Sequence, residues 1–221
     1  MDCDLSNFRR IGARAGLATM LCVALLGPAH AGAPDPEARY QALLAAAKAG
    51  DRPVDWRALR FAYADRPSFS VFGDELQDIR KQMFTAFEAK DYATALGLAQ
   101  RIIDQDFIDS DAHLIIAACD GAMGQPRLGQ RDREIGLALI QSIETGDGQT
   151  PATALSVITV AEEYAYLRAK GLRPTRQALV RDGGHSYDLL TTTDQDGKPH
   201  EVYFLIDRVL ADEAKALTLN K

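Results

Sequence analysis

Residues 76–103 read LQDIRKQMFTAFEAKDYATALGLAQRII, and this stretch decides the fold. Two runs of apolar residues recur every three or four positions, the spacing of an amphipathic helix. Lys90-Asp91 interrupts them, which predicts a turn between two antiparallel helices. The first apolar face comprises Leu76, Ile79, Met83, Phe84 and Phe87, and the second comprises Tyr92, Ala95, Leu96, Ala99, Ile102 and Ile103.

The helical pattern continues on both sides of this pair. Apolar spacing predicts further helices over residues 37–48, 56–63, 111–123 and about 129–145. Asp55 is a candidate cap for the second of these, and the Asp109-Ser110 loop offers capping side chains for the third. The sequence up to about residue 145 is therefore predicted to be helical.

Tandem short helix pairs resemble the tetratricopeptide repeat, whose period is about 34 residues. When Ala95 is aligned with the small residue of a second repeat helix, Tyr92 falls on the usual aromatic position. Ile116, Ala117 and Gly124 then match the apolar, small and glycine positions of the following repeat. Met83, Lys90 and Phe107 depart from the small, glycine and proline positions of the first repeat. The resemblance covers residues 74–145 and implies two degenerate repeats.

The hydrophobic period changes after Gly146-Asp147-Gly148. Residues 156–160 have strand-forming character, residues 161–170 are predicted to be helical, and a last helix is expected over 209–219. Strands are expected over about 177–181, 186–193 and 201–207, with hairpin turns at Gly183-Gly184 and Asp196-Gly197. The prediction is an α+β fold, in which antiparallel helix pairs resembling tetratricopeptide repeats precede a small antiparallel β-meander with one short helix. Its regions are 1–31, 32–145 and 146–221.

The first 31 residues have the features of an export signal. Arg9, Arg10 and Arg14 precede an apolar run of twelve residues, and Ala29-His30-Ala31 is a small-x-small cleavage site. The run is shorter than the ~20 apolar residues of a membrane span. We expect cleavage after Ala31, a periplasmic or secreted protein, and no stable membrane span after removal of the signal.

Removal of the signal takes away two aspartates and three arginines, so the net charge of −6 becomes −7. This acidic balance argues against a nucleic-acid partner and against a basic membrane-surface protein. The mature chain keeps one cysteine, Cys119, so no intramolecular disulfide is possible. Because Cys119 lies in an apolar run with no activating neighbour, we expect a buried, unreactive thiol.

No metal or cofactor site is expected from the sequence. Asp104, Asp106, Asp109 and Asp111 crowd into eight residues, but the glycine and glutamate positions of a calcium loop are not met. The histidines lack the spacing of a zinc site, and no glycine-rich phosphate loop precedes a helix. We interpret the four aspartates as a solvated loop between helices.

The candidate catalytic residues are weak. His185 could act as a general base oriented by Asp188 or by a distant acid such as Glu163, at the edge of the hairpin sheet. A histidine hydrogen-bonded within the tight turn is the favoured interpretation, because no nucleophile or electrophile accompanies it.

One helix carries a candidate binding surface. Trp56, Arg60 and Tyr63 occupy positions i, i+4 and i+7, so they form one stripe on the predicted 56–63 helix. Such a stripe can bind a peptide or a sugar, or it can be the seam between two helices with Arg60 paired to an acid. The seam is the favoured interpretation.

The chain also resembles uncharacterised bacterial exported proteins that form a domain of unknown function. The resemblance rests on residues 55–63, 111–114, 162–172 and 184–188, which include Asp55-Trp56, Asp111-Ala112-His113-Leu114, Glu162-Glu163-Tyr164 and Gly184-His185-Ser186-Tyr187-Asp188. It supports the architecture and implies no activity. Two hypotheses remain: a non-catalytic module that binds an envelope protein or peptide, and an envelope hydrolase or small-ligand binder with a site between the helical and β regions.

Overall fold

Aspartate caps set where four of the helices begin. The computed structural model describes residues 35–50, 53–69 and 76–219, so the predicted export signal lies outside the described residues. The side chains of Asp35, Asp55, Asp91 and Asp109 each accept a hydrogen bond from the backbone three residues later. Within the described residues, the helices before the sheet are α1 (Pro36–Ala49), α2 (Trp56–Ala64), α3 (Gln77–Glu88), α4 (Tyr92–Gln105), α5 (Ser110–Ala122) and α6 (Gln130–Ile143).

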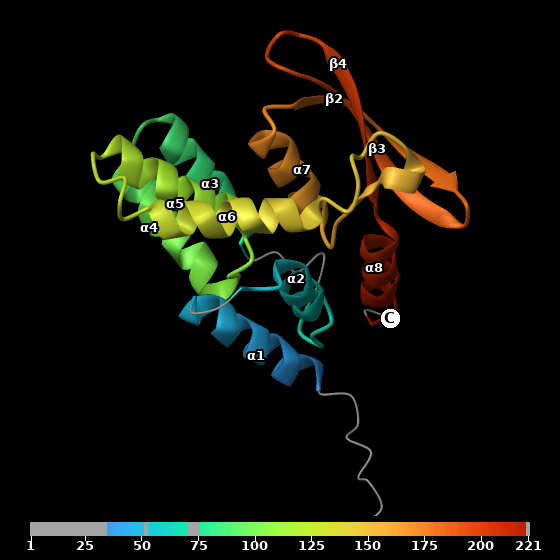
Figure 1. Cartoon of the computed structure of the whole chain (residues 1–221), viewed down its shortest axis with the longest axis horizontal. Helices are drawn as coiled ribbons and strands as arrows, with labels where there is room; N and C mark the ends of the chain where they lie inside the picture. Colours follow the sequence, from blue (N-terminus) through green and yellow to red (C-terminus); the bar gives the residue numbers. More distant parts are fainter. Residues whose placement is uncertain (1–34, 51–52, 70–75, 220–221) are drawn as a thin grey trace, which may run out of the picture. The chain divides into compact units, whose positions relative to one another are not determined.

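These helices pack as pairs, α1 with α2, α3 with α4 and α5 with α6, while α4 also packs on α5 and α2 on α6 (Figure 1). Residues 89–91 join α3 to α4, and Lys90 adopts the left-handed φ of 62° that favours glycine. Ala95 and Ala99 are fully buried, so α4 approaches its neighbours closely. The predicted helical part is confirmed.

A four-stranded sheet follows, with strand order β1-β4-β3-β2. Its strands are β1 (Leu155–Ser156), β2 (Arg173–Asp182), β3 (His185–Thr193) and β4 (Pro199–Leu205). The three predicted strands form the expected antiparallel meander, and Gly183 and Gly184 both have positive φ in the first hairpin. The strand expected over 156–160 is wrong in extent. It ends at Ser156, since Thr159 already caps the next helix, and it pairs parallel to β4.

Two helices flank the sheet, α7 (Val160–Ala169) and α8 (Asp207–Leu219). The sheet face that carries Leu190, Val202 and Phe204 shares one apolar core with Leu167 of α7 and with Ile143 of α6. The helical pairs and the sheet are therefore joined by common packing. No helix of the described segments is long and apolar enough to cross a membrane.

Candidate functional site

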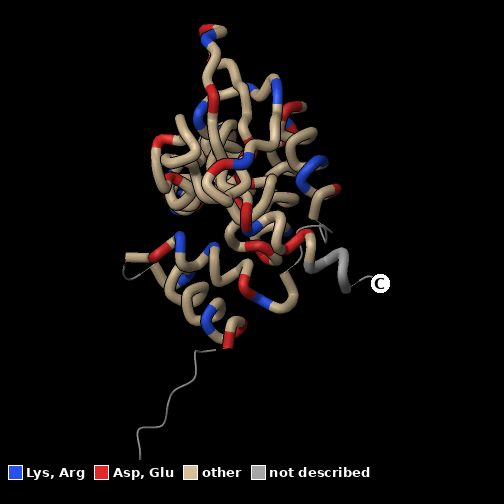
Figure 2. The backbone as a smooth tube through the Cα atoms, turned by 90° about the vertical axis from the view of Figure 1, so that its right-hand side faces the viewer, with Lys and Arg blue, Asp and Glu red and all other residues tan. Residues whose placement is uncertain are grey.

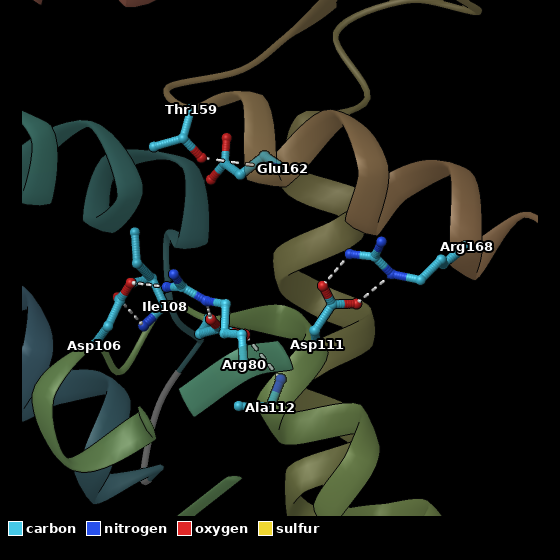
Figure 3. Close-up of polar contacts among 9 residues, drawn as sticks. Arg80, Asp106, Ile108, Asp111, Ala112, Thr159, Glu162 and Arg168 are labelled. Atoms are coloured by element: carbon cyan, nitrogen blue, oxygen red, sulfur yellow. Dashed lines mark hydrogen bonds and ion pairs between the residues drawn. The ribbon is translucent and has the colours of Figure 1, made fainter. Parts of the chain in front are cut away.

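Arginine–carboxylate pairs connect the helices to one another around the start of α5 (Figure 3). Arg80 of α3 donates to Asp109 at 2.5 Å and to Asp106 at 3.4 Å. Arg168 of α7 binds both carboxylate oxygens of Asp111 on α5. Asp106, Asp109 and Asp111 are thus ion-paired, which corrects the expectation that the four aspartates form a solvated loop, while Asp104 is exposed as expected.

Asp106 is the titratable group of this junction. Burial, followed by the nearby negative charge of Asp109, raises the pKa of Asp106 to about 7 against the opposing positive charge of Arg80. Burial also raises the pKa of Asp111, and Arg168 opposes it. The junction therefore holds carboxyl groups whose ionised forms depend on their arginine partners.

Arg60 of α2 is 1% exposed and makes contacts across the molecule. Its guanidinium donates to both carboxylate oxygens of Glu162, at 2.7 and 2.5 Å, and to the backbone oxygens of Ser142 and Ser156, each at 3.0 Å. Glu162 also accepts from the backbone N–H of Ile158. One buried guanidinium therefore joins α2, α6, β1 and α7.

A cavity of about 40 Å³ lies within this junction, lined by Tyr63, Arg80, Asp106, Ser110 and Glu162 among others. Pockets for drug-sized ligands measure ~300–1,000 Å³, and a single water needs ~10–15 Å³. Each carboxylate around the cavity already accepts from an arginine. The junction is thus built to hold helices together, and its cavity has room only for an ion or a few waters.

Two of the predicted catalytic candidates, Glu163 and Asp188, lie together between α7 and the sheet. Glu163 is fully buried, and neither of its carboxyl oxygens meets a donor in the described part of the chain. Burial raises the pKa of Glu163 to about 9, with the charges of Asp188 and Glu162 acting in the same direction. Glu163 is consequently protonated at neutral pH and lies near the carboxylate of Asp188, which accepts a hydrogen bond from Gln177 at 2.7 Å.

The third candidate, His185, has a different partner. Its Nδ1 lies 2.5 Å from Asp207, and Asp207 also accepts from the backbone N–H of Ser186. His185 and Asp188 are three positions apart on β3, so their side chains leave opposite faces of the strand. The acid that orients His185 is therefore Asp207 in place of the expected Asp188 or Glu163, and the three candidates do not form one site.

The stripe on α2 divides in two. Arg60 is the predicted seam residue paired to an acid, and Tyr63 packs edge-on against Tyr40 and Phe69. Trp56 is only partly buried and lines a groove. The interpretation as a seam between helices therefore describes Arg60 and Tyr63, whereas the alternative of a binding surface remains for Trp56.

The groove around Trp56 has a volume of about 530 Å³ and lies between the end of α1, the start of α2 and one face of α6. Its walls are about as polar as they are apolar: Ala47, Val54, Ile135 and Ala138 are among the apolar residues, and Arg131 and Glu134 add one charge of each sign. The groove can accommodate an apolar side chain of a peptide. Its two charged residues can interact with the backbone of that peptide or with the neighbouring side chains of the peptide.

A model of a family described as a domain of unknown function, DUF4919, matches residues 36–215. The chain belongs to this family. No curated protein and no solved structure matches the chain. The match covers all the described helices and strands up to the first part of α8, so the helical pairs and the sheet are both parts of the DUF4919 domain.

Several residues that the structure brings together were missed at the level of sequence. Asp207 had no signal, because it lies 22 residues beyond His185. For the ion pairs of Arg80, the sequence showed only the cluster of aspartates in residues 104–111 and gave no indication of the arginine. Within the described segments no group of three or more His, Cys, Asp or Glu side chains could hold a metal ion.

Proposed function

We propose that this DUF4919 protein is a non-catalytic module that binds a protein or peptide, and that it does so outside the cytoplasm after export. In this proposal the helix pairs act as they do in tetratricopeptide-repeat proteins, by presenting a groove to an extended or helical ligand. The single observation that carries the proposal is the groove at Trp56.

The groove has the composition of a peptide-binding surface. Its volume of about 530 Å³ falls in the range of known ligand sites. Trp56 supplies a large, rigid contact area, and tryptophan and arginine are enriched among the residues that dominate binding energy. The opposite charges of Arg131 and Glu134 allow a partner to be oriented along the groove.

The alternative of a hydrolase or a small-ligand binder between the helical and β regions requires His185 to work with Asp188 or Glu163. His185 pairs with Asp207 instead, and Glu163 and Asp188 are buried between α7 and the sheet. The geometry therefore favours the binding module.

Export is supported by the arginines, the apolar run and the small-x-small site of residues 1–31. N-terminal sequencing of the protein from its native cells tests it. We expect a chain that begins at Gly32, and a protein that still begins at Met1 in the cytoplasm would refute export without affecting the groove.

The binding proposal is tested with a peptide display library selected on the protein. Trp56 is the only tryptophan of the chain, so its fluorescence reports occupation of the groove directly. Selected peptides should shift the emission of Trp56, and Ala138→Trp, which fills the groove, should abolish their binding. The matched control is Ala118→Trp, at an exposed position of α5. Binding that leaves Trp56 emission unchanged and survives Ala138→Trp would contradict the proposal.

A further inference from the structure

Strand β2 forms one edge of the sheet, and among the described strands its ten residues pair only with β3, with a bulge at Thr175. The hairpin turn at Gly183-Gly184 is closed by the pair Asp182–His185. Because hydrogen-bonded and non-bonded pairs alternate along an antiparallel ladder, Gln177, Leu179 and Arg181 direct their N–H and C=O groups away from β3. The open edge therefore presents three backbone positions, spaced as another strand would meet them.

The edge is basic, although the protein as a whole is acidic. Arg173, Arg176 and Arg181 are all exposed, and within the described ranges none of them forms an ion pair. Asp182 is the single acidic residue of the strand, so β2 carries three positive charges and one negative charge. Elsewhere basic and acidic residues are interspersed along the chain (Figure 2), and arginines such as Arg80 and Arg168 are matched by carboxylates.

Apolar side chains lie on both faces of this edge. Leu179 is 56% exposed and stands opposite Asp188, on the sheet face that α7 covers. Ala178 and Val180 are partly exposed on the other face, beside Leu189 and Tyr187 of β3. A strand added here would place its alternate side chains against these two apolar rows.

We propose that the β2 edge binds an extended acidic segment of another protein by strand addition. Main-chain hydrogen bonds to residues 177–181 would hold the segment, and its carboxylates would meet Arg181 beside the paired residues and Arg176 and Arg173 where the segment continues past them. This surface is separate from the groove at Trp56, so the inference goes beyond the proposed function and can fail independently of it.

A second copy of this chain fits the edge less well. In one antiparallel register, with Gln177 opposite its own copy, Arg173 would face Arg181 of the other protomer, and like charges directly opposite one another are destabilising. An acidic segment removes this repulsion. Pro174 and the bulge between Pro174 and Arg176 interrupt the first part of the strand, so the segment would pair mainly with residues 177–182.

The probe is a fluorescein-labelled peptide, (Glu-Val)5, titrated with the protein at neutral pH and followed by fluorescence polarisation. The peptide (Glu-Pro)5 carries the same charge but has proline at every second position, so it cannot add as a strand. We expect (Glu-Val)5 to bind, with increased hydrogen-exchange protection of the Leu179 amide, and (Glu-Pro)5 to bind at least tenfold more weakly.

Two variants test the two parts of the inference. Leu179→Pro removes an outward N–H without removing a bond to β3, and should reduce affinity at least tenfold, while Leu179→Ala keeps the N–H and should bind within threefold of the wild type. Replacing Arg173, Arg176 and Arg181 together by glutamine should also reduce affinity at least tenfold.

Equal binding of the two peptides, or binding of (Glu-Val)5 that gives no protection in β2, would overturn strand addition. Absence of any binding would mean that the arginines and Pro174 only protect the edge from pairing. A concentration-dependent dimer that Leu179→Pro dissociates would assign the edge to a second copy instead. If Leu179→Pro fails to fold, the arginine variant and the exchange measurement still decide the question.

Discussion

Replacing the buried carboxyl of Glu163 by an amide should make the stability of the protein less sensitive to rising pH. In Glu163→Gln the amide can donate an N–H to Asp188, but it does not titrate. In the wild type, Glu163 is protonated when folded up to its pKa of about 9, whereas a glutamate exposed to water has a pKa of 4.5. Between these two values the folded state holds a proton that the unfolded state releases, so rising pH lowers the free energy of unfolding.

The magnitude follows from the number of protons. One proton corresponds to ~1.4 kcal/mol for each pH unit within this window, so the wild type should lose about 3 kcal/mol relative to Glu163→Gln between pH 6 and pH 8. Asp106 has a raised pKa as well, but it is present in both proteins and its contribution cancels in the comparison.

The assay is urea unfolding of both proteins, followed by circular dichroism at several pH values from 6 to 8. Glu201→Gln, at an exposed position of β4, is the matched control and should follow the wild type at every pH. A difference between the wild type and Glu163→Gln that stays constant over this range would refute the assignment of a bound proton to Glu163.

Three further substitutions follow from packing and backbone geometry, each measured by urea unfolding at pH 7. Arg60→Ala should cost about 3–5 kcal/mol, because Glu162 then remains without its buried partner, whereas Arg133→Ala at an exposed position should change little. Gly136→Ala should destabilise by about 1–3 kcal/mol, since its Cβ would lie 2.8 Å from Leu114, while Gly97→Ala has open space and should stabilise by about 0.5–1 kcal/mol. Lys90→Gly should stabilise by about 1 kcal/mol by relieving a left-handed φ, and loss of stability there would contradict the assignment of strain.

Local patterns were sufficient to predict most elements of the fold. Helical spacing and the capping aspartates predicted α1 to α6 within a few residues, and the Gly183-Gly184 turn predicted the β2–β3 hairpin. Strand β1 was predicted at the wrong extent, because Thr159 begins a helix within a run of β-branched residues. Here a local cap overrode β propensity.

The ion pairs between helices could not be predicted from local sequence patterns. Arg60 and Glu162 are 102 residues apart, and Asp111 and Arg168 are 57 apart, so no spacing rule connects them. The stripe on α2 did predict that Arg60 pairs with an acid, but only the folded chain identifies that acid. Side-chain alternation along β3 already places His185 and Asp188 on opposite faces of the strand. The actual partner of His185, Asp207, could not be predicted because it belongs to a helix that follows the sheet.

The position of Arg60 has a consequence for how this family diverges. Its guanidinium donates hydrogen bonds to residues on three other elements, so its loss would leave a carboxylate and two carbonyls without a partner in the interior at once. A lineage can therefore exchange this arginine only together with Glu162, through an apolar pair of similar volume. Homologues that lack one of the two residues should lack both, and such covariation of the two positions would be evidence that the contact is maintained across the family.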